Sequence, residues 1–135
     1  MSAHRVPLVV VLLAALSGGA LRAQTSAPAA WQATPASVLK SALRSTLAAQ
    51  DRYYAANETY APSIEALGLR PEAGVRVDIL RASASGWQGR ATHQSQPGRS
   101  CVVFVGSLNG AEAPRTDGDH EMAGEEGIPL CDRMR

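Results

Sequence analysis

The chain has 135 residues, a length that supports one domain with a modest core rather than two. Its 13 basic and 12 acidic residues give a formal net charge of +1, which excludes the strongly basic surface of a nucleic-acid-binding protein. The charge is uneven, because residues 106–135 hold seven acidic and three basic groups. We therefore expect no nucleic-acid partner, and an acidic segment near the C-terminal end.

Residues 1–23 have the three-part layout of a secretory signal peptide. Arg5 supplies a positive charge, residues 6–16 form a nearly unbroken apolar run, and small residues up to Ala23 offer a cleavage point. The alternative is a membrane anchor, but a spanning helix needs about 20 apolar residues, and Arg22 interrupts this run. We expect an exported protein, periplasmic or extracellular, whose mature form does not span a membrane.

Residues 24–33 are rich in Ala, Ser, Thr and Pro and predict a flexible linker. Thr34 followed by Pro35 is typical of a helix start, because Thr accepts a free N–H and Pro suits the first helical position. Apolar residues then recur at helical spacing, which predicts an amphipathic helix from about 34 to 56. Asn57 is expected to end it in the left-handed conformation.

Beyond this helix the sequence predicts one short helical turn at residues 63–68 and then a change of period. From Gly74 onward apolar and polar residues alternate, which indicates strands with one buried face. Residues 75–81, 87–93 and 101–105 predict three strands in an antiparallel meander. Residues 106–129 have no periodicity and predict a long surface loop.

The predicted fold class is α+β. Residues 34–135 form one domain, in which a long N-terminal helix packs on a three-stranded antiparallel sheet and a disulfide bounds the C-terminal loop. We expect the helix and its exit to pack on the sheet through a set of aliphatic and aromatic side chains: Leu43, Leu47, Tyr53, Tyr54 and Tyr60.

Cys101 and Cys131 are the two cysteines of the chain, and both follow the predicted signal peptide. In an exported protein an even cysteine count predicts a disulfide. The alternative is a pair of metal ligands, but two distant thiols without a nearby histidine pair make a poor zinc site. We interpret the pair as a disulfide that closes the C-terminal loop.

The order of elements and several short motifs resemble the globular domains of type IV pilins and pseudopilins. Residues 49–60 read AQDRYYAANETY and look like the pilin-type exit from the helix, AQ-x-x-YY-x-x-N-x-x-Y. Residues 64–69, 82–87 and 101–106 resemble the segments that follow. The resemblance covers about residues 37–106 and the second cysteine. It implies the fold of a pilin head and a partner in a pilus, a secretion system or another part of the cell envelope.

The chain departs from that family at its N-terminus. Assembling pilins carry a prepilin cleavage point and a glutamate five residues into the mature apolar helix, and this chain has neither. A mature protein that starts near Gln24 lacks the apolar helix through which filament subunits bury against their neighbours. The resemblance therefore implies a pilin head without the assembly helix.

Two function classes remain. The first is a non-enzymatic protein that acts by contact, since no catalytic set and no cofactor motif is visible around His93 or the cysteines. The alternative is a small periplasmic cation- or ligand-binding module that uses the acidic loop 117–126. We interpret this loop as solvated and predict no metal site. The candidate ligands of the alternative are Asp117, Asp119 and Glu121.

Overall fold

The computed structural model describes residues 32–135. The predicted signal peptide and nearly all of the predicted linker therefore lie outside the described residues. Within the described part, no helix combines the length and the apolar character that crossing a membrane requires.

The single α-helix of this part, α1, spans Pro35–Asn57. It starts as predicted, because the hydroxyl of Thr34 accepts the N–H of Ser37 at 3.2 Å and Pro35 occupies the first turn. One stripe of the helix is buried, and its members recur at helical spacing: Leu39, Leu43, Thr46, Ala49 and Gln50.

The end of α1 differs from the prediction by one residue. Glu58, not Asn57, adopts the left-handed conformation with φ 55°, and its N–H donates to the carbonyl of Tyr54 at 2.8 Å. Asn57 remains helical, and its side-chain amide donates to the carbonyl of Tyr53 at 2.9 Å. The asparagine therefore closes the last turn with its side chain, while its neighbour provides the backbone reversal.

The connection from α1 to the sheet contains two overlapping turns within the segment that was predicted as one helical turn. Leu67 donates to the carbonyl of Ile64, and Gly68 donates to that of Glu65 with a φ of +67°. Ile64 is 7% exposed and belongs to the core. Leu67 and Leu69 also pack against the core, so three aliphatic side chains anchor the connection.

The sheet has four antiparallel strands in the order β1-β2-β3-β4. They are β1 Val75–Ala82, β2 Gly86–His93, β3 Ser100–Gly106 and β4 Leu130–Cys131. The α+β class is confirmed, but the prediction of three strands is wrong. Strand β4 has two residues, too few for any alternation to show in the sequence.

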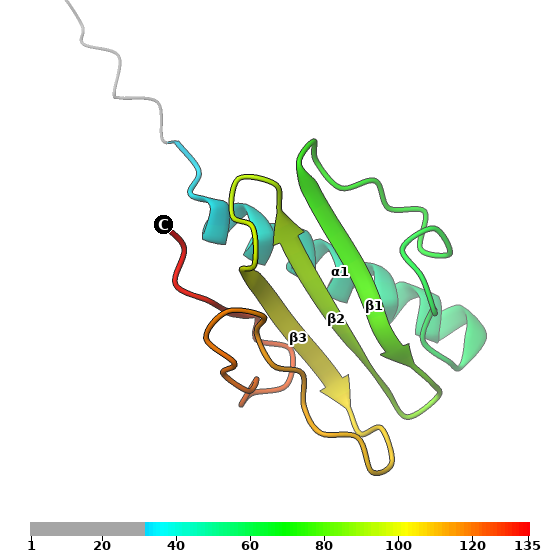
Figure 1. Cartoon of the computed structure of the whole chain (residues 1–135). Helices are drawn as coiled ribbons and strands as arrows, with labels where there is room; N and C mark the ends of the chain where they lie inside the picture. Colours follow the sequence, from blue (N-terminus) through cyan, green and yellow to red (C-terminus); the bar gives the residue numbers. More distant parts are fainter. Residues whose placement is uncertain (1–31) are drawn as a thin grey trace, which may run out of the picture. The chain divides into compact units, whose positions relative to one another are not determined.

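The α1 helix covers one face of the sheet (Figure 1). The core between these two layers includes Trp87, which is fully buried, and the aliphatic stripe of the helix. Gly89 lies two residues further along β2, on the same face. A Cβ atom at Gly89 would lie 2.7 Å from Cζ3 of Trp87, so the indole ring lies over the glycine backbone.

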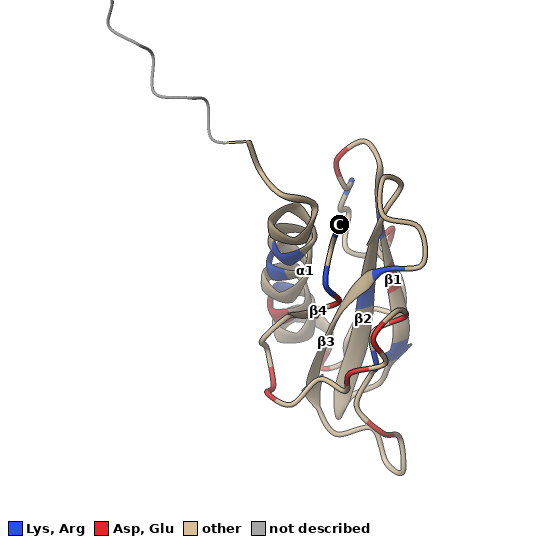
Figure 2. Ribbon diagram, turned by 60° about the vertical axis from the view of Figure 1, so that its left-hand side comes forward, with Lys and Arg blue, Asp and Glu red and all other residues tan. Residues whose placement is uncertain are grey.

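The opposite face of the sheet is covered in part by the C-terminal loop. Val102 points away from the α1 side, since Cys101 and Val103 belong to the core, yet it is fully buried. Gln88 on the same outer face donates from Nε2 to the carbonyl of Glu112 at 2.7 Å. Figure 2 shows part of this loop on the side of β2 and β3 that faces away from α1. The domain therefore has three layers, with the loop as the third.

Candidate functional site

The reversal of the chain after α1 is organised by the buried side chain of Gln50. Its Nε2 donates to the carbonyl of Ala61 at 2.9 Å, and its Oε1 accepts the N–H of Ala61 at 2.7 Å. Both residues are fully buried. A buried amide that satisfies both backbone polar groups of one residue fixes the path of the chain, because any displacement would leave them unpaired. We call residues 50–61 the helix exit.

The tyrosines of the helix exit have three different environments. Tyr60 is half-buried and packs against the core, and its N–H donates to the carbonyl of Ser83 at 3.1 Å. Tyr53 is half-buried and lies beside Ala66 and Leu67 of the connection. The ring of Tyr54 lies against that of Tyr60, with centroids 4.7 Å apart and planes inclined by 33°.

This arrangement corrects part of the predicted helix–sheet packing. Leu43, Leu47 and Tyr60 take part in it, since Leu43 is fully buried and the other two pack against the core. Tyr54 does not, because 38% of it is exposed. Tyr53 faces the connection rather than the sheet. Tyr54 continues the spacing of the buried stripe, four residues after Gln50, but it lies past the last buried member near the end of the helix. Helical periodicity alone does not show where the stripe stops being covered.

The hydroxyl of Tyr60 lies in an apolar and negatively charged environment. Burial raises its pKa above the ordinary value, and the negative charges of Asp51 and Glu126 and the neighbouring Tyr54 raise it further. The phenol of Tyr60 therefore stays neutral at physiological pH. The carboxylates of Asp51 and Glu126 both influence its hydroxyl, although they come from different parts of the chain.

The disulfide joins Cys101 and Cys131, as predicted, across residues that pair directly in β3 and β4. Cys101 is fully buried in the core, and Cys131 packs against it. The bridge therefore fastens the C-terminal loop at the point where it rejoins the sheet.

A second fastening comes from Asp132, which is 3% exposed and directly follows the bridge. Its carboxylate accepts the backbone N–H groups of Ser100, Gly118 and Asp119 at 2.6 to 2.9 Å. Burial alone would raise its pKa, but the hydrogen bonds from Thr116 and from these amides outweigh it, so its pKa lies below the ordinary value. The carboxylate thus fixes the conformation of residues 116–119.

The candidate cation ligands of the alternative reading, in the acidic loop, do not converge on a common point. Asp117 pairs with Arg90 at 3.3 Å, and Asp119 pairs with Arg99 at 2.7 Å and accepts the N–H of Arg133. Glu121 is exposed. Within residues 32–135 no group of three acidic, histidine or cysteine side chains is arranged to hold a metal ion. The two aspartates serve the structure as partners of arginine.

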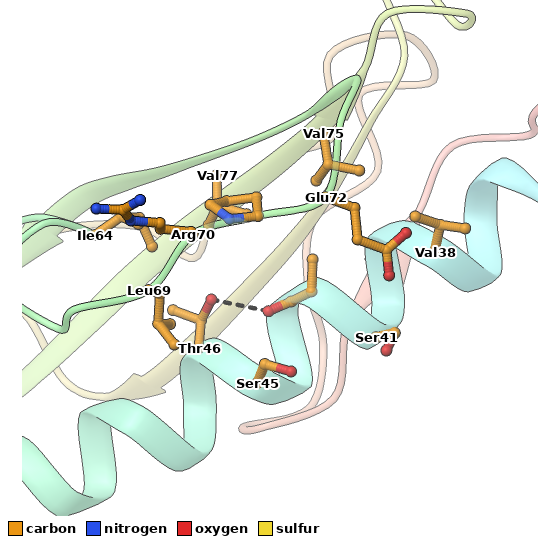
Figure 3. Close-up of a pocket in the computed structure, with 12 residues that line it drawn as sticks. Val38, Ser41, Ser45, Thr46, Ile64, Leu69, Arg70, Glu72, Val75 and Val77 are labelled. Carbon is orange, nitrogen blue, oxygen red and sulfur yellow. Dashed lines mark hydrogen bonds between the residues drawn. The ribbon is translucent and has the colours of Figure 1, made fainter.

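A small cleft lies between α1, the connection and β1 (Figure 3). Its volume is about 220 Å³, and its apolar side chains include Val38, Leu69 and Val77, with Ser41 and Ser45 at its edge on the helix. Thr46 is buried here and satisfies its hydroxyl within the helix, on the carbonyl of Ala42. Small-molecule sites usually have about 300–1,000 Å³. This cleft alone is below that range, but it adjoins a more open hollow of about 740 Å³ that shares Leu69 and Val77.

His93 is engaged locally at the end of β2. Its Nδ1 accepts the N–H of Ser95 at 3.1 Å and lies 2.7 Å from the hydroxyl of the same serine. The imidazole therefore shapes the turn between β2 and β3.

Gln50 and Asp132 organise the domain, although neither is a predicted site residue. For Gln50 a signal existed, because a polar side chain on the apolar stripe of a helix needs a buried partner. For Asp132 no signal was available, since its partners lie far away in the sequence. A scan against protein-family models and a search of curated proteins found no match to this chain.

Proposed function

We propose that this chain is an exported, non-enzymatic, pilin-like protein that acts by contact with another protein or surface in the cell envelope. The observation that carries the proposal is the helix exit. The motif AQ-x-x-YY-x-x-N-x-x-Y corresponds here to a connected structural unit, in which Gln50 holds Ala61, Asn57 closes the helix and Tyr60 joins the hairpin turn. A motif whose residues cooperate in this way supports the resemblance to a pilin head better than sequence letters alone.

The disulfide supports the exported location. Disulfides persist in oxidising compartments, such as the periplasm and the extracellular space. The bridge between Cys101 and Cys131 therefore agrees with the signal peptide expected at residues 1–23. The long helix on an antiparallel sheet, followed by a disulfide-bounded loop, is also the order of elements that the resemblance implies.

The export part of the proposal is tested by intact mass. The protein is expressed in its full length, and the periplasmic, secreted and membrane fractions are analysed with and without reductant. We expect a soluble form that begins near Gln24 and gains two hydrogens on reduction. A form that keeps residues 1–23 and stays in the membrane fraction would contradict the proposal.

The contact part is tested by site-specific photo-crosslinking in cells. A benzophenone amino acid replaces Tyr54 in one strain and, in a control strain, the exposed Gln94 in the turn at the other end of β2. We expect a crosslink from position 54 to an identified pilus, secretion-system or other envelope component, and none from position 94. Equal crosslinking from both positions, or none from either, would argue against a specific contact at the helix exit.

A further inference from the structure

Tyr54 and Tyr60 form an aromatic pair at the surface. Their centroid distance of 4.7 Å is within the range of favourable aromatic contacts. Tyr60 is half-buried and packs against the core, while 38% of Tyr54 remains exposed. The pair therefore presents a fixed ring surface to solvent, because one member is immobilised by packing and the other lies against it.

Two carboxylates flank this pair from different elements. Asp51 lies one turn before Tyr54 on α1, so the two side chains share a face of the helix. Glu126 comes from the C-terminal loop, and its carboxylate accepts the N–H of Gly106 at 2.6 Å. Figure 2 shows acidic positions both on α1 and in the loop that runs below the C-terminal end of this helix.

A chain of backbone contacts holds Glu126 at the same end of the sheet as Tyr60. Tyr60 donates to the carbonyl of Ser83 in the turn between β1 and β2, and Gly86, which closes that turn, pairs with Gly106. The raised pKa of Tyr60 agrees with this placement, because Glu126 contributes to it. The basic residue nearest in sequence, Arg52, lies instead with Tyr53 beside the connection.

From this arrangement we infer that Tyr54, Tyr60, Asp51 and Glu126 form a binding site for a cationic side chain, a lysine or arginine of the partner protein. The inference rests on the proposed contact function and specifies the partner's chemistry. A cation is attracted to the face of a tyrosine ring within about 6 Å. The two carboxylates add long-range attraction, which is stronger at low salt. An uncharged apolar side chain would not be attracted by the carboxylates of Asp51 and Glu126.

The test is a titration of the mature protein with a short peptide that contains two lysines, followed through the NMR signals of the tyrosine rings. The control peptide carries norleucine in place of each lysine, which keeps the aliphatic chain and removes the charge. We expect the signals of Tyr54 and Tyr60 to shift with the lysine peptide alone. Raising the salt concentration from 0.05 to 0.5 M should weaken the binding.

Three variants assign the binding to this site. Tyr54→Ala should weaken the binding of the lysine peptide about fivefold, which corresponds to the loss of one exposed cation–π contact. Tyr54→Phe keeps the ring and should bind like the unchanged protein. Glu126→Gln should weaken binding by about two- to fourfold and reduce its salt dependence.

The inference is overturned if the norleucine peptide binds equally well, or if Tyr54→Ala binds the lysine peptide unchanged. Heteronuclear spectra of each variant establish that it is folded, so loss of binding by unfolding is recognised. Failure here differs from failure of the proposed function, because the mass analysis and the envelope crosslinks do not depend on a cationic ligand.

Discussion

At the residue scale, single polar and small side chains decide where the chain turns and how closely its layers approach. Gln50 and Gly89 are the clearest cases. The first supplies two hydrogen bonds inside the core, and the second supplies space for an indole ring. Neither contributes much apolar area, yet each fixes a geometry on which larger neighbours depend.

Replacing Gln50 should destabilise the domain strongly. In Gln50→Leu the N–H and carbonyl of Ala61 lose both partners in a buried site, which should cost about 2–4 kcal/mol in the free energy of unfolding. The measurement is chemical denaturation followed by circular dichroism. Gln94→Leu, at an exposed position, is the control and should change stability by less than about 0.5 kcal/mol. Similar stabilities of the two variants would contradict the role of Gln50.

Adding one methyl group at Gly89 should also be costly. The new Cβ would meet Cζ3 of Trp87 at 2.7 Å, and the fully buried indole has little freedom to move. Overpacking of this kind costs about 1–3 kcal/mol. Gly124→Ala is the matched control, since its Cβ meets no atom within 4 Å. A thermal melt in which both variants unfold at the same temperature would show that the ring adapts freely.

At the element scale, the C-terminal loop behaves as a third layer rather than as a free appendage. It is held by the disulfide, by the carboxylate of Asp132 and by the contact of Gln88 with Glu112. The loop in turn covers Val102, so part of the outer sheet face is not available for a partner. Contacts of the domain are therefore expected at its ends and along the helix.

Removal of the disulfide should loosen this layer. The bridge spans a sequence separation of 30 residues. In the chain-entropy description the double variant Cys101→Ala with Cys131→Ala should lose about 3–4 kcal/mol of stability. Thermal melts with and without reductant are the measurement, and reductant should affect the unchanged protein only. Unaltered stability of the double variant would mean that Asp132 and the strand pairing hold the loop without the bridge.

At the scale of the whole molecule, the ionic groups of the loop link stability to pH. Hydrogen bonds lower the pKa of Asp132, and those from Arg133 and Arg99 lower the pKa of Asp119. A lowered pKa means that the folded state favours the carboxylate. The stabilisation is complete above the unfolded-state pKa, near 3.8, and is lost as the pH falls through the lower folded-state pKa.

The resulting prediction concerns the acid limb of the stability curve. Between pH 5 and pH 2 the free energy of unfolding should fall for the unchanged protein, and Asp132→Asn should fall less steeply, because one linked proton is removed. Urea denaturation at several pH values measures both slopes. Parallel curves would show that Asp132 binds its proton equally in the folded and unfolded states. The variant Asp119→Asn, measured in the same way, gives the contribution of the Asp119 carboxyl to the pH dependence of stability.

Calcium should leave the stability of the whole domain unchanged. Asp117 and Asp119 already serve Arg90 and Arg99, so a cation would have to replace these contacts before it could bind. We expect no change of the melting temperature at millimolar calcium or magnesium. A rise that Asp117→Asn or Asp119→Asn abolishes would instead favour the alternative function, a cation-binding module of the acidic loop.

The sequence by itself determined the features that depend on local pattern: the start of α1, the change of period at Gly74, the three longer strands and the pairing of the two cysteines. Capping and side-chain periodicity involve residues that are close in the sequence. The disulfide follows from the even cysteine count, which does not depend on where the cysteines stand. The expected α+β class, with the helix on the sheet, is confirmed on this basis.

The tertiary structure alone decided the rest. It made Glu58 the left-handed residue, left Tyr54 at the surface, paired the two residues of β4 with β3 and turned the predicted surface loop into a layer over Val102. The pairing of β4 and the covering of Val102 depend on segments distant in the sequence, and a one-dimensional pattern does not encode which segments will meet. The roles of Gln50 and Asp132 likewise follow from tertiary structure, because the fold places Ala61 and Gly118 within hydrogen-bond distance of their side chains.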